Sequence, residues 1–191
     1  NRSRPVETSR PLRYERAKGS KGTLIKSIHC NVAILTTRSL VFRSLPLRGP
    51  SATILCMATS ILFVCMGNIC RSPAAEAVFE HLACERGVAH AFELDSAGTG
   101  GWHAGEPADA RSAEEGSRRG YTLRSRARKV VRDDLDRFDL IVCMDRENQS
   151  NLRAMGSSSA QAKLLLDWHP TARGEDVPDP YYGGDEGFVH M

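Results

Sequence analysis

Two residues separated by five others, Cys65 and Arg71, carry the strongest chemical signal in this sequence. An arginine guanidinium can donate two parallel hydrogen bonds to two oxygens of a phosphate group. A cysteine beside such a cation is favoured as the thiolate, the form of the side chain that attacks electrophiles. The pair therefore predicts a site that binds a phosphate group and attacks its phosphorus atom.

The segments on either side of the pair indicate where it lies in the fold. Residues 60–64 form an apolar run that predicts a strand buried on both faces, and residues 72–82 predict a helix. Ser72 is the expected N-cap of that helix, with Pro73 at its first position. The cysteine and the arginine are therefore expected in a strand-to-helix turn.

A turn of this kind forms a concave anion site, because successive backbone N–H groups and the N-terminus of the helix point into it. Gly67 and Asn68 tolerate the positive φ angles that such a turn requires. A lone cysteine would more simply be buried and inert, but here an anion site, a nucleophile and a clamp coincide. The expected phosphate-binding residues are Met66, Gly67, Asn68, Ile69, Cys70, Arg71 and Ser72.

The nine residues from Cys65 to Pro73 resemble the active-site loop of the low-molecular-weight protein tyrosine phosphatases. A second segment, residues 179–182, matches the Asp-Pro-Tyr-Tyr segment of that family, although its composition alone would indicate a surface turn. The resemblance spans residues 57–191 and implies protein tyrosine phosphatase activity. It also implies that Asp179 is the general acid.

The resemblance implies a mechanism in which Cys65 attacks the phosphorus and forms a cysteinyl-phosphate. Asp179 would protonate the leaving phenolate and then activate the water that cleaves the intermediate. The Ser72 hydroxyl would support the sulfur, and Cys70 could capture an oxidised Cys65 as a disulfide. The expected catalytic residues are Cys65, Arg71 and Asp179, with Ser72, Ser96 and Cys70 in supporting positions.

An aryl phosphate substrate requires flat walls that can stack on its ring. The residues expected to form these walls are Trp102, Tyr181 and Tyr182. His103, beside the tryptophan, is expected to face solvent rather than to act in catalysis. Many family members have a histidine near the position of Ser125 that supports the hydroxyl of the serine after the arginine. Whether Ser125 or a neighbouring arginine gives the Ser72 hydroxyl such support stays an open question of the sequence.

The loop alone leaves other interpretations open. Thioredoxin-coupled arsenate reductases carry a similar loop but need further cysteines to relay a disulfide. Cys84 in a helix and Cys143 in a strand are poorly placed for that. A catalytically inactive phosphate-binding module is a third interpretation, which the intact cysteine, arginine and aspartate disfavour. A basic nucleic-acid-binding protein is the fourth, and it rests only on the charge of residues 1–56.

Strands that alternate with helices predict an α/β fold: a single domain with a central parallel sheet flanked by helices and the phosphate-binding loop after the first strand. Ligands of such sheets bind beyond the carboxyl ends of the strands. Cys65, residues 96–102 and Asp145 should therefore gather at one edge. Further strands are expected at residues 92–98, 138–144 and 163–168, and further helices at residues 109–119, 133–136 and 146–154.

The 191 residues carry a formal net charge of +3, which is unevenly distributed. Residues 1–56 contain eleven basic and two acidic residues, whereas residues 57–191 have a net charge of −6. The basic leader has three interpretations: an organellar transit peptide, a disordered tail, or sequence upstream of a true start at Met57. We expect one phosphatase-like domain over residues 57–191, with its final helix cut short.

The expected substrate is a phosphotyrosine protein or a small aryl phosphate, handled by a monomer without a cofactor, metal, nucleic-acid or membrane partner. No apolar run approaches the ~18–20 residues that span a bilayer. The six cysteines show neither a disulfide framework nor a metal-ligand spacing with the six histidines. A reducing compartment is therefore expected: the cytoplasm, or an organelle if the leader is a transit peptide.

Overall fold

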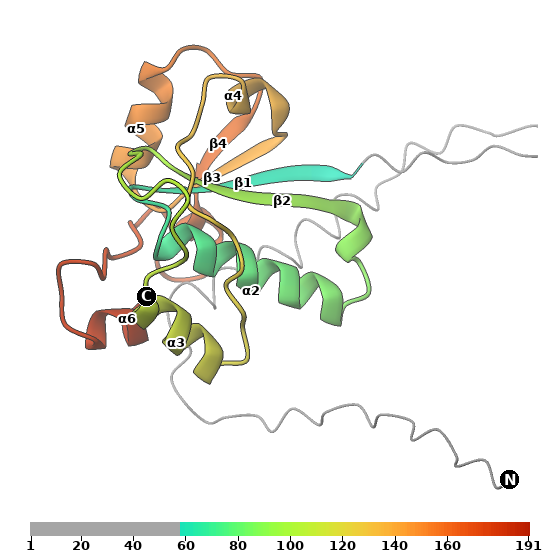
Figure 1. Ribbon diagram of the computed structural model, residues 1–191. Helices are drawn as coiled ribbons and strands as arrows, with labels where there is room; N and C mark the ends of the chain where they lie inside the picture. Colours follow the sequence, from blue (N-terminus) through green and yellow to red (C-terminus); the bar gives the residue numbers. More distant parts are fainter. Residues whose placement is uncertain (1–57) are drawn as a thin grey trace, which may run out of the picture.

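The computed structural model describes residues 58–191 (Figure 1). The leader at residues 1–56 and Met57 lie outside the described residues, so the interpretations of the leader stay predictions. Along the chain the elements are β1 (Thr59–Cys65), α2 (Arg71–Glu85), η1 (Ala89–Ala91), β2 (Phe92–Gly98), α3 (Ala110–Arg118), α4 (Asp134–Arg137), β3 (Leu140–Cys143), α5 (Arg146–Ala154), β4 (Gln161–Leu164), η2 (Leu165–Trp168) and α6 (Glu186–His190).

The four strands form one parallel sheet in the order β2-β1-β3-β4, which confirms the predicted α/β fold. The register pairs Cys65 with Gly98 and Val64 with Cys143, so the carboxyl ends of the three strands meet at one edge. The chain leaves β1 toward one side for β2 and returns to the other side for β3. Open parallel sheets bind their ligands at such a point of reversal.

The strand β1 is buried on both faces because a layer of helices covers each side of the sheet. Figure 1 shows α2, α3 and α6 on one face and α4 and α5 on the other. Phe63 points toward α2, where its ring centroid lies 5.9 Å from that of Phe79. Leu62 and Val64 belong to a second core cluster on the opposite face, together with Leu152 of α5. Successive side chains of a strand alternate between faces, so this strand needs apolar residues at every position.

Two elements have the predicted bounds. The strand β2 spans Phe92–Gly98, and α5 spans Arg146–Ala154 as expected. Asp145 caps α5, since its Oδ1 accepts a hydrogen bond from the backbone N–H of Asn148 at 2.7 Å. This cap holds the aspartate at the carboxyl end of β3, beside the end of β1.

The predicted start of α2 is wrong. The helix begins at Arg71, so Ser72 is its second residue and Pro73 its third. Cys70 occupies the N-cap position without a side-chain cap. The Ser72 hydroxyl lies instead 3.1 Å from the sulfur of Cys65 and does not cap the helix.

Both predicted bounds of the last strand are also wrong, since β4 begins two residues earlier, at Gln161. The strand β4 stops at Leu164, and the following four residues form the 3₁₀ helix η2. The Asp167 carboxylate accepts a hydrogen bond from the Leu164 backbone N–H at 3.1 Å and so closes this turn. An apolar run of three leucines hides the turn at the level of the sequence.

Gly98 lets the end of β2 approach the turn after β1. A Cβ on this residue would lie 2.8 Å from the carbonyl oxygen of Met66 and 3.0 Å from the carbonyl carbon of Gly67. The backbone of Gly98 also pairs with a neighbouring segment, donating to the Arg128 carbonyl and accepting from Val130, both at 2.8 Å. A side chain here would therefore push the predicted phosphate-binding turn out of place.

We predict that Gly98→Ala lowers the free energy of unfolding by about 1–3 kcal/mol, as other insertions into packed positions do. It should also weaken the binding of inorganic phosphate, because the displaced backbone belongs to the predicted phosphate-binding turn. Urea unfolding with and without phosphate measures both effects, since a ligand of the folded state raises stability. Gly184→Ala is the matched control, because its added Cβ meets nothing within 4 Å. If the two variants had the same free energy of unfolding and the same gain from phosphate, this role of Gly98 would be contradicted.

Candidate active site

A cavity of about 250 Å³ opens at the carboxyl edge of the sheet. Three separate parts of the chain line it: the turn after β1, the loop after β2 and the segment before α6. The three residues predicted as catalytic, Cys65, Arg71 and Asp179, all lie in its wall. The other lining residues are Met66, Gly67, Ile69, Cys70, Trp102, His103, Tyr181 and Tyr182.

The sulfur of Cys65 lies at the base of the turn among polar groups. Its Sγ is 3.1 Å from the Ser72 Oγ and accepts a hydrogen bond from the Asn68 backbone N–H at 3.2 Å. All three residues are buried. The sulfur therefore faces a hydroxyl and an N–H that can both donate to a thiolate.

Asn68 holds the turn from behind. It has φ of 56°, so it takes the left-handed conformation that was predicted for the turn, whereas Gly67 does not. Its Nδ2 donates to Ser72 Oγ at 2.9 Å and to Ser96 Oγ at 3.0 Å. The predicted supporting residues Ser72 and Ser96 are thus joined to the cysteine through one amide.

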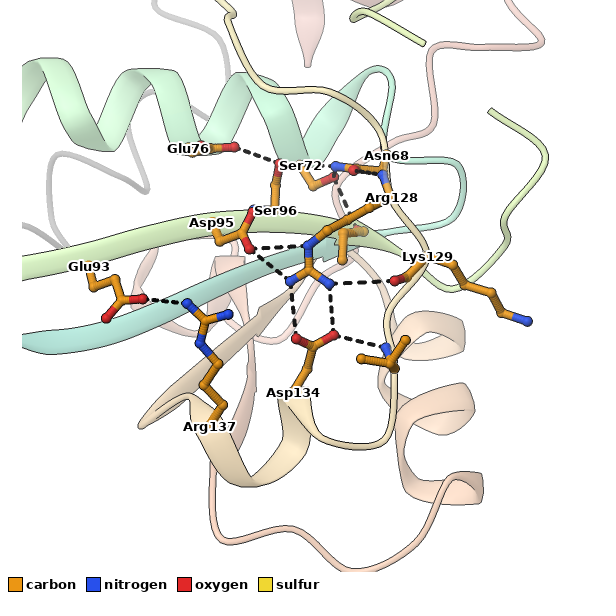
Figure 2. Close-up of polar contacts among 12 residues, drawn as sticks. Asn68, Ser72, Glu76, Glu93, Asp95, Ser96, Arg128, Lys129, Asp134 and Arg137 are labelled. Carbon is orange, nitrogen blue, oxygen red and sulfur yellow. Dashed lines mark hydrogen bonds and ion pairs between the residues drawn. The ribbon is translucent and has the colours of Figure 1, made fainter. Parts of the chain in front are cut away.

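Glu76 ends this chain of hydrogen bonds, and the sequence did not single it out. The Ser96 hydroxyl donates to its Oε2 at 2.6 Å (Figure 2). Burial raises the pKa of the Glu76 carboxyl above its ordinary value, and hydrogen bonds from Ser96 and Ser125 oppose this rise. Ser125, near the position where many family members have a histidine, thus contacts the glutamate. The one signal in the sequence was a carboxylate within the apolar face of α2.

Arg71 is buried between two carboxylates. Its Nη1 donates to Asp145 Oδ2 at 2.7 Å and to the Val177 carbonyl at 3.2 Å, and its Nη2 donates to Asp179 Oδ2 at 2.6 Å. These contacts use three of its five N–H groups. Among the described residues, the Nε–H and the second Nη2–H have no such partner and could bind two oxygens of a phosphate.

Asp145 performs two tasks, of which the sequence predicted one. Its Oδ1 caps α5, and its Oδ2 accepts the hydrogen bond from Arg71. The prediction that this aspartate and Cys65 gather at one edge of the sheet is confirmed. The ion pair itself joins residues 74 positions apart and has no local signal in the sequence.

Aromatic side chains form the rim of the cavity. The Tyr181 and Tyr182 rings meet edge-on with centroids 5.1 Å apart, and Tyr182 is 81% exposed. Trp102, 73% exposed, packs over Gly100, where a Cβ would overlap its ring. The Tyr181 backbone N–H donates to Asp179 Oδ1 at 3.1 Å and so joins the rim to the predicted general acid. That these rings bind a phenyl group stays a prediction.

His103, expected to face solvent, lies in the wall of the open cavity with its side chain 26% exposed. Its Nδ1 lies 2.7 Å from Glu106 Oε2, and its ring centroid lies 6.2 Å from that of Tyr181. A Cβ on Gly67 would lie 3.3 Å from the His103 ring, so the glycine makes room for it. The glycine-rich loop before the histidine folds it onto the turn, which its sequence position does not reveal.

In the part of the chain that the structure describes, no group of three or more His, Cys, Asp or Glu side chains is arranged to hold a metal ion. None of the helices within residues 58–191 is long and apolar enough to cross a membrane.

Comparison with known proteins decides the family. The sequence model described as "Low molecular weight phosphotyrosine protein phosphatase" matches residues 60–191. The chain belongs to this family. The Bacillus subtilis relative named low molecular weight protein-tyrosine-phosphatase YfkJ is 46% identical over 129 residues, which cover 66% of this chain and 83% of the relative.

Two further comparisons agree with this assignment. The Homo sapiens low molecular weight phosphotyrosine protein phosphatase is 40% identical over 135 residues, covering 68% of this chain and 84% of its own length. The crystal structure of a protein tyrosine phosphatase from Entamoeba histolytica matches with a TM-score of 0.66 and 40% identity, covering 70% of this chain and 88% of that one.

The cysteines of this phosphatase differ in their surroundings. Cys70 lines the cavity but packs its thiol against Ile69, Ala127 and Phe188, and burial raises its pKa to about 12. It therefore stays a thiol at neutral pH, and capture of an oxidised Cys65 by this thiol stays a prediction. The remaining two described cysteines lie outside the cavity: Cys84 is exposed on α2, and Cys143 is buried in the core cluster on the opposite face of the sheet.

Glu76 should make the stability of the phosphatase depend on pH. Its raised pKa means that the folded protein binds this proton more readily than the unfolded chain does. The stabilisation is complete below the ordinary glutamate value of 4.5 and is lost as the pH rises through the raised, folded value. Glu76→Gln cannot ionise, so it should gain stability relative to the parent as the pH rises through this window.

Urea unfolding at a series of pH values measures this gain. Glu80→Gln, on an exposed position one turn further along α2, controls for the loss of a surface charge. If the difference in free energy of unfolding between Glu76→Gln and the parent did not change with pH, the buried carboxyl would not titrate as its surroundings imply.

Proposed function

We propose that this chain hydrolyses phosphotyrosine and other aryl phosphate monoesters through a cysteinyl-phosphate intermediate. One observation carries the proposal: Cys65, Arg71 and Asp179 line a single cavity whose rim is aromatic. A nucleophile, a cationic clamp and a carboxyl group within one small space are the parts that phosphoryl transfer through a covalent intermediate needs.

Substrate binding begins with the phosphate dianion in the turn after β1. The backbone N–H groups of residues 66–72 and the two remaining donors of Arg71 would hold its three equatorial oxygens. The dianion then competes with Asp179 for the arginine, which holds that carboxylate at 2.6 Å. Asp179 then stands beside the bound ester, where a carboxyl group can serve as general acid.

The Cys65 thiolate then attacks the phosphorus in line. A sulfur–phosphorus bond forms while the bond from phosphorus to the phenolic oxygen breaks, and Asp179 gives its proton to that oxygen. The carboxylate that results can take a proton from a water molecule, whose oxygen attacks the cysteinyl-phosphate. Inorganic phosphate leaves, and the Ser72 hydroxyl, 3.1 Å from the sulfur, can donate to the returning thiolate.

The surroundings of the cysteines favour hydrolysis over arsenate reduction. A disulfide relay would need a second thiol that can reach Cys65 and a third that can resolve the bond. Cys84 is exposed on α2, and Cys143 is buried on the opposite face of the sheet. The carboxyl of Asp179 at the cavity, in contrast, fits the acid and base steps of hydrolysis.

The rim fits a substrate presented on a protein surface. Trp102 and Tyr182 are mostly exposed and stand beside a cavity large enough for a phenyl phosphate. We extend the proposal to a reducing compartment such as the cytoplasm, because the four described cysteines are all free thiols. That the enzyme is a monomer stays a prediction.

Cys65→Ser should abolish phosphate release, and Asp179→Asn should slow hydrolysis of phenyl phosphate about 10²–10⁴-fold, the usual contribution of general acid–base catalysis. Asp179→Asn should slow the hydrolysis of 4-nitrophenyl phosphate much less, because that leaving group needs no proton. Steady-state kinetics on the two esters measures the difference. Asp176→Asn is the matched control, since this aspartate lies on the same loop and contacts Arg146 instead. An equal loss on both esters would remove Asp179 from the role of acid.

A further inference from the structure

Arg128 is clamped by two carboxylates behind the turn that holds the cysteine (Figure 2). Its Nε and Nη2 donate to Asp95 Oδ2 at 3.1 and 2.9 Å. Its Nη1 and Nη2 donate to the two oxygens of Asp134 at 2.8 and 3.1 Å. The guanidinium therefore bridges β2, which carries Asp95, to α4, which begins at Asp134. Four charge-assisted hydrogen bonds fix both its position and its plane.

The backbone of Arg128 contacts the catalytic turn directly. Its N–H donates to Asn68 Oδ1 at 2.8 Å, and its carbonyl accepts from the Gly98 N–H at 2.8 Å. The amide of Asn68 thus holds the peptide group before Arg128, and the end of β2 holds the peptide group after it. Movement of the arginine would move the only described group that donates to this amide oxygen.

The contact decides which way round the Asn68 amide lies. Because Oδ1 accepts from the backbone N–H, Nδ2 must face the hydroxyls of Ser72 and Ser96 and donate to both. The Ser72 oxygen then acts as an acceptor toward the amide, and its own hydrogen is available to Cys65 at 3.1 Å or to the Ala97 carbonyl at 3.4 Å. A thiolate is the stronger acceptor, so the hydrogen turns to the sulfur.

A neighbouring ion pair is more exposed than this clamp, in which the Arg128 and Asp95 side chains are 31% and 33% exposed. Arg137 Nη2 lies 2.6 Å from Glu93 Oε1 on the same side of the sheet (Figure 2), but both side chains are more than half exposed. Such pairs contribute little. The Asp134 side chain, in contrast, is only 5% exposed and also accepts from the Val131 N–H.

We propose that Arg128 is a positioning residue for the reaction at Cys65, and that it acts through Asn68. The clamp holds the backbone N–H that orients the amide, and the amide directs the Ser72 hydroxyl at the sulfur. This inference rests on the proposed function, in which Cys65 is the nucleophile. Arg128 is not among the residues that line the cavity, so it acts from behind the turn.

A double-mutant cycle on kcat tests the inference. Arg128→Met should lower kcat for 4-nitrophenyl phosphate about tenfold, equivalent to ~1.4 kcal/mol, while KM changes less than about twofold, because the substrate-binding wall is untouched. Asn68→Gly removes the amide and keeps the positive φ at little cost. In that background, Arg128→Met should lower kcat by no more than about twofold.

Arg137→Met is the matched control and should leave kcat unchanged. Arg128→Lys retains the charge but lacks the planar guanidinium that makes the four fixed hydrogen bonds, so it should restore only part of the lost rate. If Arg128→Met does not fold, the same cycle is run with Asp95→Asn, which weakens one side of the clamp and leaves the arginine in place. The inference would be overturned if the loss of kcat in the double variant equalled the product of the two single losses. It would also be overturned if Arg128→Met lowered kcat no more than Arg137→Met does.

Hydrogen exchange of the Asn68 side chain gives a readout that does not depend on catalysis. Both Nδ2 hydrogens are donated to buried hydroxyls, so they should exchange slowly in the parent and in Arg137→Met, and much faster in Arg128→Met. Asn68→Gly identifies their signals by NMR. Failure of the proposed function would appear as an inactive parent with this exchange pattern intact. Unchanged exchange in Arg128→Met would refute the positioning role itself.

Discussion

A buried cation is the constraint on which the rest of this structure depends. Arg71 is 3% exposed, and a charge in such a place is costly unless it is paired and hydrogen-bonded. Asp145 and Asp179 supply the pairing from positions 74 and 108 residues further along the chain. The order of the sheet brings the first of them to the edge where β1 ends, and the second comes from the segment before α6. The fold therefore converges on one guanidinium that still has donors for a phosphate.

The two sides of the catalytic turn are built differently. Behind it, Asn68, Ser72 and Ser96 are almost fully buried and joined by hydrogen bonds that continue to Glu76 and to the clamped segment at Arg128. In front of it, the rim residues Trp102 and Tyr182 are mostly exposed. Buried support behind the sulfur suits an enzyme that must place one nucleophile accurately, and an exposed rim leaves the cavity open to substrate.

Local patterns predicted the parts of the site that lie within one turn or at one strand end. The apolar run of β1, the turn residues after Cys65 and the cap at Asp145 each have a physical signature within a few residues. The sequence gives Ser72 two possible roles, helix cap and partner of the Cys65 sulfur, and only the second is found. Other parts of the site depend on partners far away in sequence. Glu76 joins the site only through Ser96. Arg128 joins it only through Asn68 and through two aspartates that hold its side chain.

The account depends most directly on a covalent bond between Cys65 and the phosphoryl group. Rapid mixing of the full chain with 4-nitrophenyl phosphate, an acid quench within the first turnover and peptide mass spectrometry would test for it. The account predicts a phosphoryl group on the peptide that contains Cys65, formed at the rate of the initial release of nitrophenolate. Nitrophenolate release with unmodified Cys65, or a phosphoryl group on another residue, would contradict it.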